Sequence, residues 1–380
     1  MRIATSRPQQ VYRRNKGVLN LLHLDGWLLL GILLLLATSA AVVYSASGGS
    51  DAVIFRHLVR IGFALGLLFL FAQIPPTLLY IFTPWLFLFG LILLIAVPIF
   101  GDIGKGAQRW LEIGPIRFQP SELMKLVLPL MVAWLFAHSK LPPSFERIVV
   151  ALVVIGVTSG LIVIQPDLGT SLLIAMSGLF VVFFAGLPWR VILLAIAGVV
   201  ASAPIAWQFM HAYQKQRVLT FLNPESDPLG SGYHIIQSKI AIGSGGLEGK
   251  GFMGSTQAHL DFLPESTTDF IFSVLSEEFG LLGVILLLAL YTFVIARGLY
   301  ISSQAQDNFT RLIAASLTMT LFVYAFVNIG MVSGLLPVVG LPLPLISYGG
   351  SSLVTLMISF GILMSIHTHK KLLTAKDPEG

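Results

Sequence analysis

The sequence contains no cysteine and few charged residues, and both absences limit what the protein is. Without cysteine it has no disulfide bond, no thiolate metal ligand and no cysteine nucleophile. Charged residues make up 11% of the 380-residue chain and hydrophobic residues 56%, whereas soluble domains usually carry about 25% charge. Such a chain has too few polar side chains to cover a surface in water, so we expect it to use lipid as its solvent.

Motifs for nucleotide and metal chemistry are also missing. The sequence contains no Walker phosphate-binding loop, no zinc-ligand spacing and no Ser–His–Asp pattern. His367 and His369 are two residues apart, so they do not share a helix face and form a poor metal pair. We therefore do not expect chemistry driven by ATP. The net charge of +5 is a weak hint of nucleic-acid binding, because the positions of the charges matter more than their sum.

Ten apolar runs are long enough, or nearly so, to cross a bilayer as helices, which takes about 20 residues. The first run exceeds the roughly 7–15 residues of a signal-peptide core, so we expect it to remain as a helix. The runs predict an all-α polytopic membrane protein of about ten transmembrane helices, with one transmembrane domain at 24–367 between tails at 1–23 and 368–380. They are 24–46, 58–73, 77–100, 120–138, 147–164, 170–186, 189–210, 270–296, 312–334 and 346–367.

The positions of Lys and Arg predict which side of the membrane each loop occupies. With the N-terminus in the cytoplasm, the segments on that side are short and hold 13 of the 23 Lys and Arg residues. An excess of positive charge in short cytoplasmic loops is typical of membrane proteins. We therefore expect both termini in the cytoplasm and the two longest loops, 101–119 and 211–268, outside it.

The remaining ten basic residues lie in the outer loops or in the helix ends beside them, where the orientation rule disfavours them. Two explanations remain open, since these residues either bind an anionic ligand on the outer side or pair with outer acidic residues. They are Arg56, Arg60, Lys105, Arg109, Arg117, Lys125, Lys215, Arg217, Lys239 and Lys250.

The large extracytoplasmic loop between the seventh and eighth predicted helices, 211–268, is too long for a simple connection. Ordered loops of this length are usually functional. Part of it, 233–242, is amphipathic and is suited to lie along the membrane surface. Glu277 and Glu278 follow inside the next predicted span, where ionisable residues are costly. They either line a cavity or bond to a neighbouring helix.

The start of the fourth predicted helix carries one acidic and one basic residue. Glu122 and Lys125 are three residues apart, so they share one helix face, and Pro120 suits the first helical turn. Ionisable residues in a span are functional candidates by default. Either the two form a structural ion pair, or they form the polar wall of a substrate cavity in which Lys125 and Arg109 bind phosphate.

Two aspartates precede predicted helices on the outer side. Asp167 lies in a short turn, where we expect it to cap the following helix. Asp269 falls at the membrane boundary next to Phe270 and Ile271, where a carboxyl group is suited to act as a general base. The alternative is that 266–269, which contains only Ser, Thr and Asp, is an ordinary helix start.

The last predicted helix opens with mostly small residues at 346–352, which include Ser347 and flank Tyr348. Small residues let helices or ligands approach closely, and the N–H groups of a helix start bind anions. Substrate binding and tight helix packing therefore both remain open for this segment.

Six motifs resemble those of one protein family. They are GAQRW (106–110), QPSE (119–122), QPDLGT (165–170), QSKIAIGSGG (237–246), LPE followed by TDF (263–270) and ISYGGSS (346–352). The resemblance covers nearly the whole chain, and the family is the SEDS proteins (shape, elongation, division and sporulation), which are polytopic peptidoglycan polymerases. The chain is most similar to the RodA branch, because of its short N-terminal tail, Gln108 and the segment 257–264.

The resemblance implies a reaction. SEDS proteins polymerise lipid II into β-1,4-linked glycan strands by inverting glycosyl transfer, at the outer face of the cytoplasmic (inner) membrane. The donor would be the growing strand on undecaprenyl diphosphate, which is released, and the acceptor would be the GlcNAc 4-hydroxyl of lipid II. The essential aspartate of the family corresponds to Asp269 here, with the role of general base.

The resemblance also implies substrate contacts. A diphosphate departs well only if its developing charge is stabilised. Arg109, Lys125 and Lys239 are the candidates for this role, with a divalent cation such as Mg²⁺ as a further aid. The other expected substrate contacts are Gln119, Ser121, Glu122, Asp167, Glu265, Ser347 and Tyr348.

The expected partners follow from the same resemblance. They are the lipid-linked substrates, membrane lipid, a class B penicillin-binding protein and other membrane proteins of the elongation complex. The sequence contains no transpeptidase motif, so a crosslinked product would need the penicillin-binding protein. No nucleic-acid partner is expected.

Two other functions compete with the polymerase. A lipid II flippase would need polar residues at mid-bilayer depth and pseudo-symmetric halves. Here the polar residues gather toward the outer ends of the predicted spans, and no convincing internal repeat is visible. A non-catalytic scaffold for the penicillin-binding protein would tolerate replacement of Asp269 without loss of polymerisation.

Overall fold

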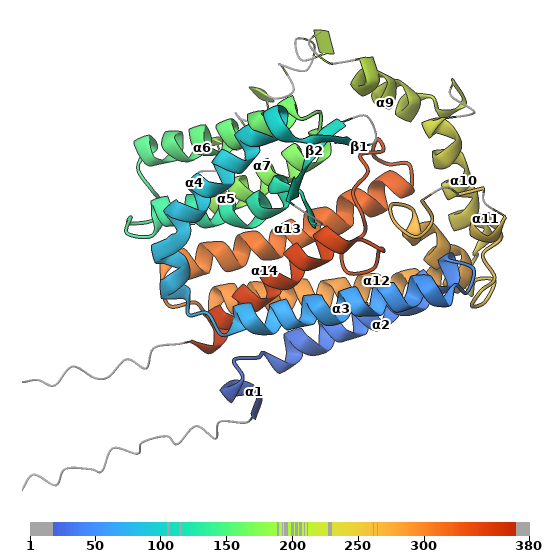
Figure 1. The fold of residues 1–380 in the computed structure, drawn as a ribbon, viewed down its shortest axis with the longest axis horizontal. Coiled ribbons are helices and arrows are strands. Elements are labelled where there is room, and N and C mark those ends of the chain that lie inside the picture. The colour runs from blue at the N-terminus through green and yellow to red at the C-terminus, as the bar shows by residue number, and fades with distance from the viewer. Residues whose placement is uncertain are drawn as a thin grey trace, which may run out of the picture.

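The computed structural model describes residues 18–104, 107–113, 116–187, 212–226, 230–260, 262–263 and 265–369, with scattered positions from 190 to 210. Long helices run side by side in one bundle, and most of the shorter elements gather at one end of it (Figure 1). These helices confirm the polytopic all-α membrane fold that the sequence predicts.

Nine of the ten predicted spans correspond to described helices. Seven of these are long and apolar enough to cross a membrane, and α7 is a shorter apolar helix of 17 residues. The remaining predicted span, 189–210, lies almost entirely outside the described residues. The nine helices are α2 (Gly26–Ala46), α3 (Asp51–Ala72), α4 (Pro76–Phe100), α5 (Pro120–Phe136), α6 (Phe145–Ile164), α7 (Leu168–Phe184), α12 (Ile271–Ser303), α13 (Asn308–Val332) and α14 (Gly350–Thr368).

Polar residues set where several helices begin. The side chains of Asp25, Asp167 and Asp307 each accept a hydrogen bond from the backbone N–H three residues on, at 2.8, 3.2 and 2.9 Å. They thereby cap α2, α7 and α13. Pro120 occupies the first turn of α5, where its missing N–H costs nothing. The cap expected at Asp167 and the helix start expected at Pro120 are both confirmed.

The last helix begins later than the sequence predicts. α14 starts at Gly350, within the segment 346–352 that was expected to open it, and not at Ile346. The Tyr348 N–H donates to Thr267 O at 2.9 Å, and Ser347 Oγ donates to Thr268 O at 2.6 Å. These bonds to a distant segment hold the chain in a turn, and the helix can begin only after it.

The two described ends of the chain meet at one end of the bundle. The short helix α1 (Val18–Leu21) precedes α2, and the rings of His23 and His369 stack with 3.9 Å between their centroids. Arg297 Nη2 donates to Asp25 Oδ2 at 2.6 Å. Burial would raise the pKa of Asp25, but its hydrogen bonds to Arg297 and to the backbone outweigh this and lower it. We call this end the terminal end and the opposite end, where the strands lie, the loop end (Figure 1).

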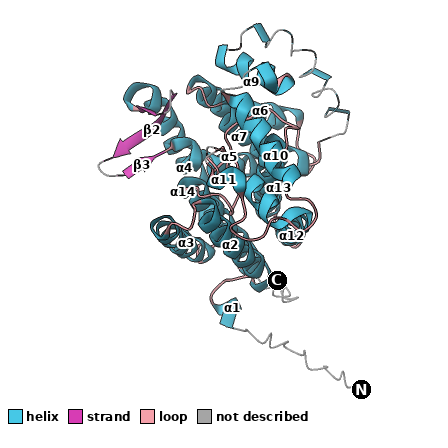
Figure 2. Cartoon of the chain, turned by 90° about the vertical axis from the view of Figure 1, so that its right-hand side faces the viewer, coloured by secondary structure: helices cyan, strands magenta, loops and turns pink. Residues whose placement is uncertain are grey.

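A three-stranded antiparallel sheet, which no pattern in the sequence predicts, connects α4 to α5 at the loop end. Its strands, β1 (Asp102–Gly104), β2 (Ala107–Ile113) and β3 (Ile116–Phe118), lie in the order β1-β2-β3. Figure 2 looks onto the loop end and shows β2 and β3 projecting at its edge. The two outer strands have three residues each, too short for an alternating pattern to be recognised in the sequence.

The large loop folds into short helices at the loop end. They are α9 (Ala212–Leu222), the 3-10 helix η1 (Pro224–Ser226), α10 (Ser231–Ser244) and α11 (Thr256–His259). α10 contains the amphipathic piece predicted at 233–242, and it packs on α12 with Ile235, Ser238 and Ala241 buried. Ser273 Oγ of α12 donates to Ser238 Oγ at 3.0 Å. The buried face of this piece therefore contacts protein, where the sequence suggested the membrane surface.

A kink in α12 joins the large loop to the bundle. Glu277 is fully buried just before the kink and accepts hydrogen bonds from Lys250 Nζ at 2.5 Å and Ser255 Oγ at 2.7 Å. The neighbouring Glu278 is also fully buried and accepts a hydrogen bond from the Ser45 hydroxyl of α2. Of the two roles open for these glutamates, the structure thus favours bonding to neighbouring segments over lining a cavity.

The kink itself depends on Gly280, whose φ of 60° and ψ of −159° suit glycine. A Cβ at this position would meet the backbone of Leu247 and Gly249. We expect Gly280→Ala to lower the free energy of unfolding by about 1–3 kcal/mol through backbone strain alone, measured by thermal unfolding in detergent. Gly66→Ala is the matched control, since a Cβ there meets open space and should not destabilise α3. Equal stability of the two variants would contradict the expectation.

Candidate active site

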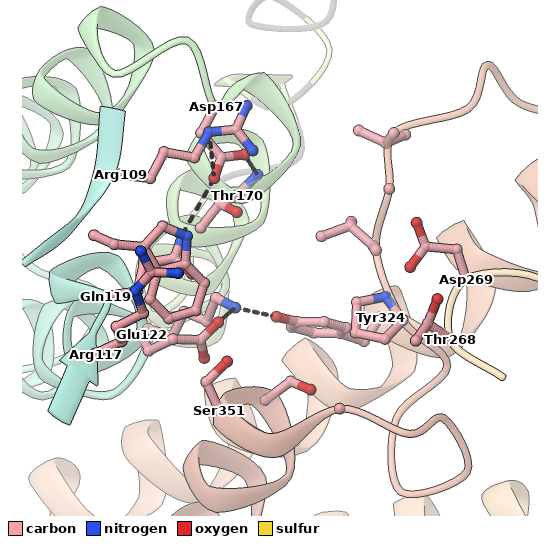
Figure 3. A pocket seen from close by; sticks show the side chains of 18 of the residues that line it. Arg109, Arg117, Gln119, Glu122, Asp167, Thr170, Thr268, Asp269, Tyr324 and Ser351 are labelled. Atoms are coloured by element: carbon pink, nitrogen blue, oxygen red, sulfur yellow. Dashed lines mark hydrogen bonds and ion pairs between the residues drawn. The ribbon is translucent and has the colours of Figure 1, made fainter. Parts of the chain in front are cut away.

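A polar cavity of about 530 Å³ lies at the loop end of the bundle. Its walls come from the sheet, from the first turns of α5, α7 and α14, from α13 and from the turns before α12 and α14 (Figure 3). Segments far apart in the sequence therefore meet around one space. The polar side chains in its lining are Asp102, Arg109, Arg117, Gln119, Glu122, Lys125, Asp167, Thr170, Thr268, Asp269, Tyr324, Ser351 and Ser352.

The deep side of the cavity holds a buried ion pair. Lys125 Nζ donates to Glu122 Oε1 at 2.7 Å and also to the hydroxyl of Tyr324. Thr355 of α14 donates to the other oxygen of Glu122 at 2.9 Å. Glu122 and Lys125 are only 8% and 5% exposed, and a buried charge is tolerated only when it is paired and hydrogen-bonded. The sequence left open whether Glu122 and Lys125 form an ion pair or the polar wall of a cavity. The structure shows both, because the ion pair itself lines the cavity.

A second ion pair joins the sheet to the turn before α7. Arg109 Nε lies 3.6 Å from Asp167 Oδ2, and Arg109 Nη2 donates to Pro166 O at 2.5 Å. Gln119 Nε2 donates to the same oxygen of Asp167 at 3.4 Å. Asp167 thus caps α7 and at the same time holds Arg109 at the cavity.

Arg117 of β3 adds a cation at the exposed rim of the cavity. Its partner is Glu112, which lies opposite it in the pairing of β2 with β3. Their hydrogen bond and the attraction of their opposite charges lower the pKa of Glu112 and raise the pKa of Arg117. Both groups therefore stay charged over the whole physiological range of pH.

Asp269 lies in the turn that leads into α12, and this turn is held through its backbone. Asn328 Nδ2 donates to Asp269 O at 2.9 Å. Ser347 Oγ donates to the neighbouring carbonyl of Thr268 at 2.6 Å. On its cavity side, Asp269 Oδ2 lies 3.5 Å from the point that a Cβ on Gly340 would occupy. Two other segments thus fix a half-buried carboxylate in the cavity wall.

Figure 3 shows the two sides of the cavity facing each other. Arg109, Gln119 and Glu122 lie on one side, and Thr268 and Asp269 lie on the opposite side. A hydroxyl placed between these sides would meet a proton acceptor on one of them and positive charge on the other. This is the arrangement that general-base catalysis with a charged leaving group requires.

Comparisons with known proteins agree with the fold and the motifs. The family model described as "Cell cycle protein", named for FtsW, RodA and SpoVE, matches residues 18–372. The chain belongs to the SEDS family. Within it, the chain is 56% identical over 353 residues to the peptidoglycan glycosyltransferase MrdB of Escherichia coli (strain K12), a match that covers 93% of this chain and 95% of that protein.

Other SEDS relatives are more distant. The chain is 35% identical over 360 residues to a probable peptidoglycan glycosyltransferase FtsW of Coxiella burnetii, covering 90% of this chain and 95% of that one. A chain from a peptidoglycan synthase complex has a TM-score of 0.79 at 33% identity, covering 90% and 97%. The rod shape determining protein RodA of Thermus thermophilus has a TM-score of 0.69 at 28% identity, covering 91% and 98%. The matches together confirm the resemblance to the RodA branch.

The SEDS cavity brings together most of the residues that the sequence singled out. Those in its lining are Arg109, Gln119, Glu122, Lys125, Asp167 and Asp269. The other five are placed outside the lining. Ser347 and Tyr348 hold the turn that carries Asp269, and Ser121 is buried in the first turn of α5.

Lys239 and Glu265 also lie outside the SEDS cavity, where substrate contacts had been expected of them. Because α10 packs its small and apolar side on α12, Lys239 is left exposed, and its side chain lies against Gly334. Glu265 adopts a φ of 56°, and its carboxylate accepts a hydrogen bond from Thr268 Oγ1 at 2.8 Å. Glu265 therefore shapes the turn next to Asp269.

Three supporting residues of the SEDS site were missed in the sequence, namely Tyr324 and Asn328 of α13 and Thr355 of α14. All three are polar side chains inside predicted apolar spans, and such side chains usually face the protein interior. Tyr324 and Asn328 are four residues apart, so they lie on one helix face. That spacing is the signal that would have identified them.

The described part of this SEDS chain offers no closed cage for a metal ion, since it contains no group of three or more His, Asp or Glu side chains suited to hold one. Two of the cavity carboxylates, Glu122 and Asp167, already pair with Lys125 and Arg109. Mg²⁺ is usually bound by only one or two carboxylates together with substrate phosphates. A cation that arrives with a phosphorylated substrate therefore remains compatible with the site.

Tyr324 allows a test of how Lys125 is held in this SEDS site. Tyr324→Phe keeps the ring and removes the hydroxyl to which Lys125 donates. Because a hydrogen bond to a charged group contributes about 1.5–3 kcal/mol, we expect the free energy of unfolding in detergent to fall by that amount. The control is Tyr300→Phe at a half-exposed ring on α12, which should leave stability unchanged. A stable Tyr324→Phe variant would mean that Glu122 alone holds Lys125.

Proposed function

We propose that this SEDS protein is a peptidoglycan glycosyltransferase that polymerises lipid II into β-1,4-linked glycan strands during cell elongation. The observation that carries the proposal is the geometry of the cavity, in which Asp269 faces the wall that holds the Lys125–Glu122 pair and Arg109. The 56% identity to a peptidoglycan glycosyltransferase, over nearly the full length of both chains, supports the same activity.

In the proposed reaction the growing strand passes from undecaprenyl diphosphate to the GlcNAc 4-hydroxyl of lipid II. Asp269 takes the proton of that hydroxyl while the hydroxyl oxygen attacks the anomeric carbon of the donor. The bond from that carbon to the diphosphate breaks on the opposite face, so the configuration inverts. Undecaprenyl diphosphate leaves with the bonding electron pair, and this good leaving group makes ATP unnecessary.

The departing diphosphate needs positive charge that is already in place. Lys125 and Arg109 supply it from one wall of the cavity, and their carboxylate partners hold them in position. Arg117 adds a charge at the rim. A divalent cation such as Mg²⁺ would bind here through phosphate oxygens of the substrate and one cavity carboxylate, and it would add positive charge at the leaving group.

We place the loop end at the periplasmic face of the inner membrane and the terminal end at its cytoplasmic face. The distribution of Lys and Arg supports this orientation, and the contact of His23 with His369 supports both tails on one side. In this orientation the tails 1–23 and 368–380 are cytoplasmic, and the loop 211–268 is periplasmic. A polyprenyl tail can then stay in lipid while its sugar enters the cavity.

A class B penicillin-binding protein is the partner that we propose for crosslinking, since this chain has no transpeptidase motif. The similar structure at 33% identity comes from work on the coordination of polymerization and crosslinking by a peptidoglycan synthase complex, which supports a partner of this kind. The other proposed partners are lipid II, membrane lipid and further membrane proteins of the elongation complex.

The test is polymerisation of labelled lipid II by the purified protein with its penicillin-binding partner, in detergent or in vesicles. A moenomycin-type inhibitor silences contaminating polymerases, and a gel resolves the lengths of the glycan strands. Long strands are the expected result. Transfer of labelled lipid across the vesicle bilayer without strand formation would favour the flippase. Strands that form equally well after replacement of Asp269 would favour the non-catalytic scaffold.

A further inference from the structure

Two arginines of α3 have no carboxylate partner among the residues that the structure describes. Arg56 is exposed and Arg60 is half-buried, and they lie one helical turn apart on the same side of the helix. Their neighbours Phe55, Val59 and Phe63 are 69%, 56% and 63% exposed, as expected of a helix that faces lipid. Because charged side chains in a span are costly, these two need a negatively charged partner.

Arg60 lies directly behind one wall of the cavity. Its guanidinium is 4.4 Å from the centre of the Tyr348 ring, and its Nε is 3.8 Å from the point that a Cβ on Gly350 would occupy. Gly349 and Ser351, on either side of Gly350, line the cavity. The wall between Arg60 and the cavity thus includes Gly349 and Gly350, which have no side chains.

The cations inside the cavity differ from this pair. Lys125, Arg109 and Arg117 each have a carboxylate partner within 4 Å, which offsets their charge. Arg56 and Arg60 offer positive charge that no acidic side chain in the described part of the chain offsets within 4 Å. Arginine also binds phosphate through two parallel hydrogen bonds. The orientation rule disfavours arginine on the outer side of a membrane protein, which makes an anionic ligand the better explanation for this pair.

We propose that Arg56 and Arg60 bind the phosphate groups of a lipid that lies against the outer half of α3, beside the wall at Gly349 and Gly350. A lipid-borne phosphate has two sources there, the polyprenyl diphosphate of a substrate and the headgroup of an acidic phospholipid. In the first case the tail runs along α3 in the membrane, and the sugars pass over the two glycines into the cavity. The first case rests on the proposed function, whereas lipid binding itself does not.

Native mass spectrometry of the protein in detergent measures binding without turnover. Undecaprenyl diphosphate and phosphatidylglycerol are titrated separately against the wild type, Arg56→Ala and the double variant Arg56→Ala/Arg60→Met. A basic residue near a membrane surface changes affinity about fivefold, so we expect losses of about fivefold and about 25-fold. Arg60→Met keeps an aliphatic stem against Tyr348, and the exposed Arg56 can be changed without loss of packing. Lys140→Ala, at an exposed residue of the terminal end, is the control and should bind as the wild type does.

The outcomes assign the source of the phosphate. Weaker binding of undecaprenyl diphosphate supports a substrate site, and the KM for lipid II should then rise by a similar factor with a smaller change in kcat. Weaker binding of phosphatidylglycerol alone supports a phospholipid site, with KM unchanged. Unchanged affinity for both lipids in the folded variants would overturn the proposal. A failure of the proposed function is a separate result, because it would appear as a wild type that binds lipid but makes no strands.

Discussion

Asp269→Asn should abolish glycan polymerisation and leave the protein folded. Asparagine has the shape of aspartate but cannot take a proton, and general-base catalysis contributes about 10²–10⁴-fold to rate. The turn at Asp269 is held through backbone carbonyls by Asn328 and Ser347, so its geometry should survive the change. Strand synthesis from labelled lipid II, with the penicillin-binding partner present, should therefore fall by at least about 100-fold.

Glu265→Gln is the matched control for this variant. Glu265 is an exposed carboxylate of the same turn, and it accepts a hydrogen bond from Thr268 instead of lining the cavity. The variant Glu265→Gln should therefore keep most of the wild-type rate of strand synthesis. Thermal unfolding and binding to the partner show whether each variant is folded. If Asp269→Asn made strands as long and as abundant as the wild type does, the base would have to be sought elsewhere, first at Glu122.

Lys125→Met is expected to destabilise the protein strongly. It leaves Glu122 charged and without its cation inside the bundle, and breaking a buried ion pair in this way costs about 3–5 kcal/mol. The hydroxyls of Tyr324 and Thr355 cannot replace that charge. The thermal midpoint in detergent and the yield of monodisperse protein should both fall well below those of the wild type.

The double variant Glu122→Leu/Lys125→Met separates stability from catalysis. Replacing both members of a buried ion pair by apolar residues is often neutral for stability, so the thermal midpoint should return close to that of the wild type. Polymerisation should not return, because the cavity has lost a cation that we propose stabilises the leaving group. If stability and strand synthesis both recovered, the pair would be structural only, and Arg109 would be the cation to test next.

The long helices were predictable because lipid imposes the same rule on every span. Each must satisfy its own backbone hydrogen bonds and expose apolar side chains. The run predicted at 77–100 became α4, Pro76–Phe100, with almost the same bounds. The start of α14 was not predictable, because it depends on bonds from Ser347 and Tyr348 to a segment about 80 residues earlier in the chain. No local pattern carries that information.

Residue spacing predicted the candidate site only where residues lie close together in the sequence, and the resemblance to SEDS proteins supplied the more distant residues such as Asp269. The spacing of Glu122 and Lys125 places them on one face of one helix, and the structure shows them bonded there. The opposite wall comes from α13, α14 and the turn before α12, and no residue spacing indicates that these segments meet. A polar residue such as Tyr324 in an apolar span indicates a protein interior, but it does not indicate which other residues share that interior.

The ion pair at the deep side of the cavity also has an electrical consequence. Part of the transmembrane voltage drops between the deep side of such a cavity and the nearer aqueous phase. The energy of a lone charge at the deep side would therefore change with the voltage. A charge that crosses the full field changes in energy by about 2.3 kcal/mol per 100 mV. Glu122 and Lys125 carry opposite charges 2.7 Å apart, so the field acts on them almost equally in opposite directions. Further along the same helix, Leu128, Val132 and Phe136 are fully buried apolar side chains that continue the same face of α5 away from the cavity. A site built in this way can stay open on one face while the membrane remains energised.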